Sequence, residues 1–448
     1  MSNNSSFCRL NCTLGSLLGT AGNEGNARIV SSDEDYVGRV LNKPLELDEF
    51  TILRNFVQYI GVTGNFKEII DFFKTPEGET PAGFRVEYVL AGNILNADLV
   101  RDISYDKNGV KRPTNLLFSA DSANPYEVAP VSNLISNLTC NPGIIYDLFI
   151  NNPKANIGNK YKTRDEVMEE IGRILGPGAD ISVELNNPFS ASEREILEEA
   201  ARFKEMLSKY RVVIKVPHTG PVNKNNVGEL LNGDKKFQRR YSDGTTEDMF
   251  RGHNLALMLH EHGYRVNFTL MFEPYQTALA LQAKPYFINS FIRHRGMQTH
   301  MITGLLKAYD ASGETAFLKQ LRSYMIDTDY LSPKDADIDF FKVKETAELF
   351  VEQRKADTVE GSDGLDGVRH NLRWLRQANL PDTRLIICSM EGERNYPDID
   401  RLLTEEEFRD MVGKVVITAE PGYLARFTST PQVVAYQRRF MNAANGQK

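Results

Sequence analysis

One lysine, Lys215, interrupts the apolar run VVIKVP at residues 212–217. The β-branched residues around it predict a strand that is buried on both faces, as in a parallel sheet. Burial disfavours the charged form of a lysine, so we expect the pKa of Lys215 to fall below its usual value of about 10.4. A neutral amine can attack a ketone and form a Schiff base. The alternative interpretation is a lysine at a strand end whose ammonium group reaches water.

Polar side chains also lie at or just beyond the ends of other predicted strands. Alternate residues of a strand share a face, so Asn267 and Thr269 point the same way and Phe268 points the other way. Taken singly, each polar residue is more often a turn cap or a hydrogen-bonded core group. Taken together, they predict a cavity in which carboxylates, amides, a hydroxyl and an amine meet. The residues of this predicted site are Asp121, Asn141, Glu184, Lys215, Asn267 and Thr269.

The elements that must position these residues form a regular alternation after Pro113. Short apolar runs alternate with helical patterns, and this rhythm over roughly 300 residues predicts the α/β class and a (β/α)8 TIM barrel. Active sites of such barrels lie at the C-terminal ends of the strands. A doubly wound open sheet is the alternative, although no GxGxxG follows the first strand. The predicted strands are residues 115–119, 135–139, 181–185, 212–216, 266–271, 286–291, 384–388 and 415–418.

The N-terminal part of the chain has a different character. Residues 1–30 are rich in Asn, Ser and Gly, and we expect a disordered tail there. Amphipathic patterns predict an added N-terminal, mainly helical region over residues 31–110. The barrel is then assigned to residues 111–448, and polar or helical insertions are expected at residues 223–242 and 296–382.

Composition narrows the functional class. The net charge of −7 and the lack of a basic tract argue against nucleic-acid binding. We see neither a membrane-spanning apolar run nor a secretory signal, so we expect a cytoplasmic protein. The cysteines Cys8, Cys12, Cys140 and Cys388 are expected to be free thiols. His260 and His262 do not share a helical face, so they form a poor metal site.

Six segments, taken in order, resemble the transaldolase family. They are FSADSAN (118–124), NLTCNP (137–142), SVE (182–184), VIKVP (213–217), NFTLMF (267–272) and INSF (288–291). The resemblance extends over about residues 114–428, and the N-terminal region lies outside it. It implies a (β/α)8 barrel with a Schiff-base lysine on the fourth strand.

The resemblance also implies roles for individual residues. Lys215 would attack the ketone of a sugar donor, Glu184 and Thr269 would hold a water that carries protons, and Asp121 would act as the acid/base of carbon–carbon bond cleavage. The implied reaction transfers a dihydroxyacetone unit to an aldehyde, as in pentose phosphate chemistry. An iminium ion is the electron sink, so no metal or other cofactor is needed. Implied substrate-binding residues are Asn141, Asn267, Asn289 and Phe291.

The sequence departs from the family where two arginines usually bind the substrate phosphate. After the sixth strand, the family segment Ser-Pro-Phe-x-Gly-Arg is replaced by NSFIRHR (289–295), in which Arg293 or Arg295 could serve. After the seventh strand, Glu391 occupies the arginine position and Arg394 lies three residues further on. A carboxylate would repel a phosphate. All three arginines could equally be solvated surface residues.

These departures leave alternatives open. A small-molecule sugar or sugar phosphate is the expected partner, and a homodimer is compatible with the sequence. An aldolase acting on an unphosphorylated or specialised sugar is one alternative to a transaldolase. A catalytically silent, sugar-binding barrel is another.

Overall fold

The computed structural model describes residues 12–19, 26–73, 77–81, 83–106, 110–190, 192–208 and 210–447. The chain folds into two compact units, which we describe separately. One unit comprises residues 1–113 together with residues 175–179 and 208–211, and the other comprises the remaining residues. We refer to them as the N-terminal unit and the barrel unit.

The barrel unit is built around a closed ring of eight strands. Neighbouring strands pair in parallel, for example Lys215 with Asn267 and Ser119 with Thr418. Closure excludes the open doubly wound sheet, and each predicted strand segment overlaps an observed strand. The strands are β7 (Leu117–Asp121), β8 (Ile135–Thr139), β9 (Asp180–Glu184), β10 (Arg211–Pro217), β11 (Val266–Thr269), β12 (Phe287–Phe291), β13 (Arg384–Cys388) and β14 (Val415–Ala419).

Helices alternate with these strands and bury one face each. Helix α6 (Glu193–Met206) begins as its capping-box spacing predicts, because Ser192 Oγ accepts a hydrogen bond from the Glu195 backbone N–H at 3.3 Å. Its buried residues Ile196, Ala200 and Phe203 recur at helical spacing. The other helices of the ring are α4 (Pro125–Val128), α5 (Arg164–Leu175), α7 (Thr246–Glu261), α8 (Gln276–Gln282), α12 (Asp366–Gln377), α13 (Asn395–Thr404) and α14 (Pro421–Arg426), and the π-helix η4 (Gly143–Ile150) follows β8.

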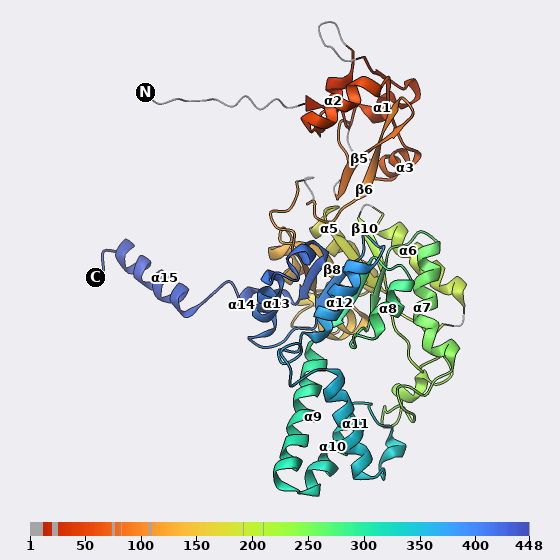
Figure 1. Cartoon of the computed structure of the whole chain (residues 1–448). Helices are drawn as coiled ribbons and strands as arrows, with labels where there is room; N and C mark the ends of the chain where they lie inside the picture. Colours follow the sequence, from red (N-terminus) through yellow and green to blue (C-terminus); the bar gives the residue numbers. More distant parts are fainter. Residues whose placement is uncertain are drawn as a thin grey trace. The chain divides into compact units, whose positions relative to one another are not determined.

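Two insertions extend the ring after β10 and β12. The first, residues 223–242, is mostly irregular and contains the short 3-10 helix η6 (Val227–Leu230). The second contains α9 (Arg293–Ser312), α10 (Thr315–Asp327) and α11 (Phe340–Gln353), which pack together as a bundle (Figure 1). We call α9 to α11 the helical insertion. It has its own apolar core, which includes Ile302, Leu321, Met325 and Val343.

The N-terminal unit combines helices with a sheet. Helices α2 (Leu47–Phe56) and α3 (Gly64–Phe73) lie where amphipathic patterns predict them. A four-stranded sheet, in the order β2-β4-β6-β5, accompanies them and was not predicted. Its strands are β2 (Arg28–Ile29), β4 (Tyr59–Val62), β5 (Phe84–Ala91) and β6 (Ile94–Arg101), and the unit also contains β1 (Cys12–Thr13), β3 (Pro44–Leu45) and α1 (Glu34–Val37).

The expectation of a disordered tail over residues 1–30 is wrong for its described part. Residues 12–19 and 26–30 contain β1, β2 and a 3-10 helix. Leu14, Leu17 and Ala27 are buried in the core of the N-terminal unit. A few apolar residues are thus enough to order a polar segment, because each of them is buried in this core. Residues 1–11 and 20–25 lie outside the described residues.

The chain ends with helix α15 (Pro431–Ala444), whose residues are nearly all exposed. Among the described residues, no helix has both the length and the apolar composition needed to cross a membrane. The described cysteines Cys12, Cys140 and Cys388 are free thiols, whereas Cys8 lies outside the described residues.

Candidate active site

The side chain of Lys215 is held inside the barrel, near the C-terminal end of β10. Only 6% of the residue is exposed. Its Nζ lies 3.1 Å from Glu184 Oε2, at the end of β9, and donates to the carbonyl oxygen of Cys140 at 3.4 Å. Two neighbouring strand ends therefore supply partners for the amine. The alternative of a lysine that reaches water does not fit this burial.

The expectation that burial would lower the pKa of Lys215 is wrong in its net direction. Burial does act to lower this pKa, but the carboxylates of Glu184 and Asp121 raise it by more. The raised pKa favours the ammonium form of Lys215, which is paired with Glu184. The amine must lose a proton before it can act as a nucleophile, and Glu184 is within reach to accept that proton.

Asp121 is the last residue of β7 and shares the interior with Lys215. Burial raises the pKa of Asp121 to about 6, while the charge of Lys215 opposes this and Glu420 and Glu184 add to it. Part of Asp121 is solvent-accessible, yet dense packing around its carboxyl group still removes most of its hydration. A carboxyl group that titrates near neutrality can both accept and return a proton.

Thr269 ends β11, beside the strand that carries Lys215. It lies in register with Pro217, two residues beyond the lysine. Its Oγ1 is buried and has no hydrogen-bond partner among the described residues. The same holds for Thr139 Oγ1, at the end of β8. A buried hydroxyl without a protein partner is a typical position for an ordered water or a ligand group.

A chain of buried hydrogen bonds crosses the barrel interior next to the lysine. Asn289 Nδ2 donates to Asn267 Oδ1 at 2.7 Å, and Asn267 Nδ2 donates to Ser182 Oγ at 3.3 Å. Ser182 Oγ then donates to Asn137 Oδ1 at 3.2 Å, and Asn137 Nδ2 donates to Ser119 Oγ at 2.9 Å. We call these five residues the amide chain. Both ends of the Asn267 amide are engaged within it.

Sequence reasoning missed three members of the amide chain, although a signal for them exists. Ser119 and Ser182 each lie two residues before a predicted carboxylate, and Asn137 lies two residues before Thr139. Period-two spacing places each of them on the inward face of its strand. Asn289, predicted to bind substrate, donates to Asn267 and also to the carbonyl oxygen of Phe268 at 2.9 Å.

The remaining predicted substrate-binding residues lie at the rim of the barrel. Asn141 follows β8, and its Oδ1 accepts a hydrogen bond from the Ile144 backbone N–H at 2.9 Å. The oxygen thus caps the following helix, and the amide nitrogen donates no hydrogen bond to the described residues. Phe291 ends β12, and its ring centroid lies 4.7 Å from that of Phe272.

The three arginines proposed for a phosphate have very different surroundings. Arg295 is buried, and its guanidinium group pairs with Asp366 and with Glu273, the latter at 2.9 Å. Arg394 is 78% exposed and lies 3.5 Å from Asp398. Arg293 is partly exposed, lies 3.8 Å from Glu391, and acts electrostatically on Asp121. Of the three, Arg293 alone has both a link to the site and an exposed guanidinium group.

The described residues contain no group of three or more His, Cys, Asp or Glu side chains that could hold a metal ion. The arrangement instead offers an amine, a carboxylate beside it and a second carboxyl group that titrates near neutrality. These are the components of acid/base-assisted covalent catalysis.

No curated protein matched the chain. The model of a family described as "Transaldolase/Fructose-6-phosphate aldolase" matches residues 118–316. This range begins in β7, ends in α10 and includes Asp121, Glu184, Lys215 and Thr269, and the match supports an aldolase-type function. Residues 118–316 of the barrel unit are therefore similar to the transaldolase/fructose-6-phosphate aldolase family, in agreement with the resemblance of the short motifs.

Proposed function

We propose that the barrel unit is a class I aldolase that transfers a dihydroxyacetone unit from a ketose to an aldehyde through a Schiff base on Lys215. The observation that carries this proposal is the buried pair of Lys215 and Glu184, 3.1 Å apart, with Asp121 coupled to it electrostatically. One carboxylate is enough to neutralise a structural lysine, whereas a second carboxyl group in the barrel interior adds a cost of burial that a structural role does not require.

The first step is formation of the Schiff base. Glu184 accepts a proton from the Lys215 ammonium, and the neutral amine attacks the ketone carbon C2 of the donor. The resulting carbinolamine loses its hydroxyl group as water and becomes an iminium ion. The buried hydroxyl of Thr269, which has no partner among the described residues, supports a water site from which protons reach the departing oxygen.

The second step breaks the bond between C3 and C4 of the donor. The Asp121 carboxylate takes the proton of the C4 hydroxyl, the C3–C4 electron pair moves into the iminium ion, and C4 leaves as the carbonyl carbon of an aldehyde. Lys215 then carries a three-carbon enamine. The engaged amide of Asn267 and the amide nitrogen of Asn141 are the groups proposed to orient it.

The last step transfers the three-carbon unit. C3 of the enamine attacks the carbonyl carbon of the acceptor, and protonated Asp121 returns its proton to the oxygen that becomes a hydroxyl. Water then hydrolyses the new iminium ion and frees Lys215. Phe291, at the rim beside Phe272, is placed to limit water access to the enamine before the acceptor arrives.

The proposal is tested by trapping. Incubation with dihydroxyacetone and borohydride should reduce the iminium ion and label Lys215, which peptide mass spectrometry locates. Lys215→Met should remove the label, whereas Lys204→Met, a change of an exposed lysine on α6, should leave it. A label on another lysine would refute the proposal. Ketose binding without any label would favour the catalytically silent barrel.

A second candidate is an aldolase for unphosphorylated sugars. It is favoured by the arginines, because Arg295 is committed to internal ion pairs and Arg293 faces Glu391. A site built in this way gives a phosphate few unopposed positive charges. Comparison of kcat/KM for fructose and fructose 6-phosphate separates the two candidates.

A further inference from the structure

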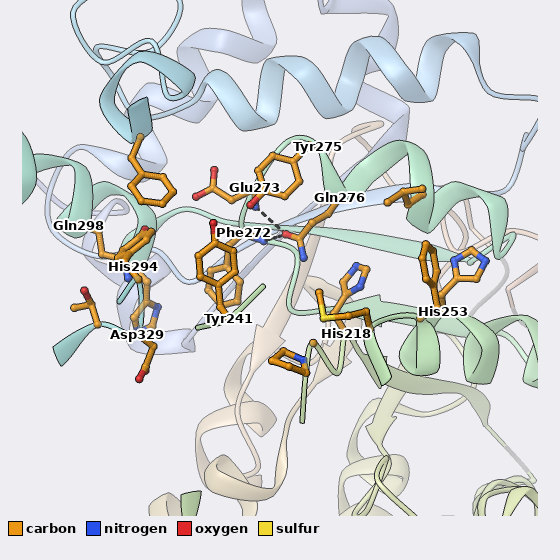
Figure 2. A pocket seen from close by; sticks show the side chains of 18 residues that line it. His218, Tyr241, His253, Phe272, Glu273, Tyr275, Gln276, His294, Gln298 and Asp329 are labelled. Carbon is orange, nitrogen blue, oxygen red and sulfur yellow. Dashed lines mark hydrogen bonds between the residues drawn. The ribbon is translucent and has the colours of Figure 1, made fainter. Parts of the chain in front are cut away.

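A cavity of about 700 Å³ lies in the barrel unit, on the side where β10, β11 and β12 end. Its walls come from the loops after these strands, from α7 and α8, and from the helical insertion (Figure 2). Six Phe and Tyr residues line it, and they come from five separate segments of the chain. They are Tyr241, Phe250, Phe272, Tyr275, Tyr330 and Phe350. We call it the aromatic cavity.

The chemistry of the aromatic cavity differs from that of a phosphate site. Among the described residues, no lysine or arginine lines it. The carboxylate of Glu273 is neutralised by Arg295 and Arg354, which do not line the cavity, and Asp329, the other acidic residue of the lining, is exposed to solvent. Burial lowers the pKa of His218 to about 4, so this imidazole is uncharged at neutral pH. Such walls favour a neutral ring system over an anion.

The aromatic cavity adjoins the proposed catalytic centre. His218 lines the cavity, but its ring lies 4.2 Å from that of Phe268, on the strand face opposite to Lys215, so the link to the centre runs along the rim of the barrel. Phe272 also lines it, and its ring stacks on Phe291 at the rim of the barrel. His294 lines it and directly follows Arg293. A molecule whose carbonyl group is near Lys215 could therefore place its far end among these rings.

We propose that the aromatic cavity binds the distal end of the aldehyde acceptor, and that this end is an uncharged aromatic group several bonds from the aldehyde carbon. The proposal rests on the proposed function and specifies its substrate class. The volume is in the range of cavities that bury small organic ligands. Both chain insertions contribute walls, Tyr241 from the first and Phe350 from the second, so the segments that enlarge this barrel also build the cavity.

The kinetic test compares two acceptors with dihydroxyacetone as the donor and the full chain as the enzyme. We expect a higher kcat/KM for 3-phenylpropanal than for glyceraldehyde. Leu279→Trp, which adds an indole to the cavity wall, should lower kcat/KM for 3-phenylpropanal about tenfold or more and leave glyceraldehyde unchanged. Leu349→Trp is the matched control, because both leucines are 50% exposed and Leu349 lies outside the lining.

A binding measurement separates the cavity from the chemistry. The unreactive alcohol 3-phenylpropan-1-ol should bind the wild-type chain and Lys215→Met equally in calorimetry, and Leu279→Trp should weaken its binding. Absence of a borohydride label on Lys215 would remove the proposed function and the acceptor role with it. A normal label without alcohol binding, or an equal loss for both aldehydes in Leu279→Trp, would overturn the role of the cavity alone.

Discussion

Lys215 and Glu184 show how a single proton sets the state of the site. Burial and the carboxylates act on the lysine in opposite directions, and the carboxylates prevail. A sequence reveals the apolar neighbours of a lysine on its own strand. It does not reveal that the end of another strand brings a carboxylate oxygen to within 3.1 Å. The direction of the pKa shift therefore could not be predicted from residues 212–217.

The first prediction concerns Glu184→Gln. The Glu184 carboxylate raises the pKa of Lys215 and burial lowers it. Without this carboxylate the pKa of Lys215 should therefore be lower than in the wild type. Schiff-base formation should nevertheless slow, because the nearby proton acceptor is gone. The pH dependence of reductive methylation at Lys215 reports the pKa, and borohydride trapping reports the rate. Glu198→Gln, an exposed change on α6, should alter neither; an unchanged lysine pKa in Glu184→Gln would contradict the argument.

The second prediction follows from the pKa of Asp121, which is about 6 in the fold compared with an ordinary value of 3.8. The fold favours the protonated form, so its stabilising contribution is present below pH 4 and is lost as the pH rises through about 6. Asp121→Asn should therefore be more stable than the wild type at pH 7, by up to about 3 kcal/mol, and equal to it at low pH. Urea unfolding at both pH values measures this difference.

The same carboxyl group should control the reaction. In the proposed mechanism cleavage requires ionised Asp121, so the cleavage rate of the wild-type chain should fall as the pH drops below about 6. Asp121→Asn should be inactive in cleavage while it still forms the Schiff base. Asp147→Asn, an exposed change on η4, is the control for both stability and rate. A stability difference that is independent of pH would contradict the assignment.

Helices and strands could be predicted where the sequence pattern of a single segment was enough to define them. The barrel strands are short apolar runs between polar loops, and each was placed within a few residues. The hairpin of β5 and β6 was missed, although Gly92 and Asn93 between two alternating runs are a known turn signal. Several helices were expected in the helical insertion. The ion pairs that hold it to the barrel were not expected, because their members, Arg295, Arg354, Glu273 and Asp366, are far apart in the sequence.

The third prediction tests this anchoring. Arg354 is 3% exposed and binds Glu273, Tyr330 and Thr299, the last at 3.0 Å. Arg354→Met should lower the free energy of unfolding by about 3 kcal/mol, because it leaves buried partners without their charge. Arg394→Met, at a residue whose side chain is 78% exposed and whose partner Asp398 also pairs with Arg401, should cost less than about 1 kcal/mol. Chemical denaturation compares the two, and equal losses would show that Arg354 does not hold the insertion.

At the scale of the whole molecule, all residues of the candidate site lie in the barrel unit. The count of strand–helix alternations was enough to predict ring closure. The aromatic cavity could not be predicted, because its walls come from two insertions and three strand ends that only the folded chain brings together.

The fourth prediction separates the two units. Phe66 is fully buried in the core of the N-terminal unit, so Phe66→Ala should destabilise that unit by about 3 to 5 kcal/mol. Limited proteolysis should then cut within residues 26–113 faster than in the wild type. Borohydride labelling of Lys215 should be unchanged, and Leu47→Ala, at a half-exposed position on α2, should change neither. Loss of the label in Phe66→Ala would show that the barrel depends on the N-terminal unit.

The amide chain has one further consequence. Its hydrogen bonds all run in the same direction, and Cys388 Sγ extends the series by approaching Asn289 Oδ1 at 3.8 Å. Each serine hydroxyl can either donate or accept, but Asn289 and Asn267 face each other directly. If only one of these two amides turned over, two oxygens or two N–H groups would meet between them. The two amides can therefore reverse only together, and this fixes the direction of their hydrogen bond.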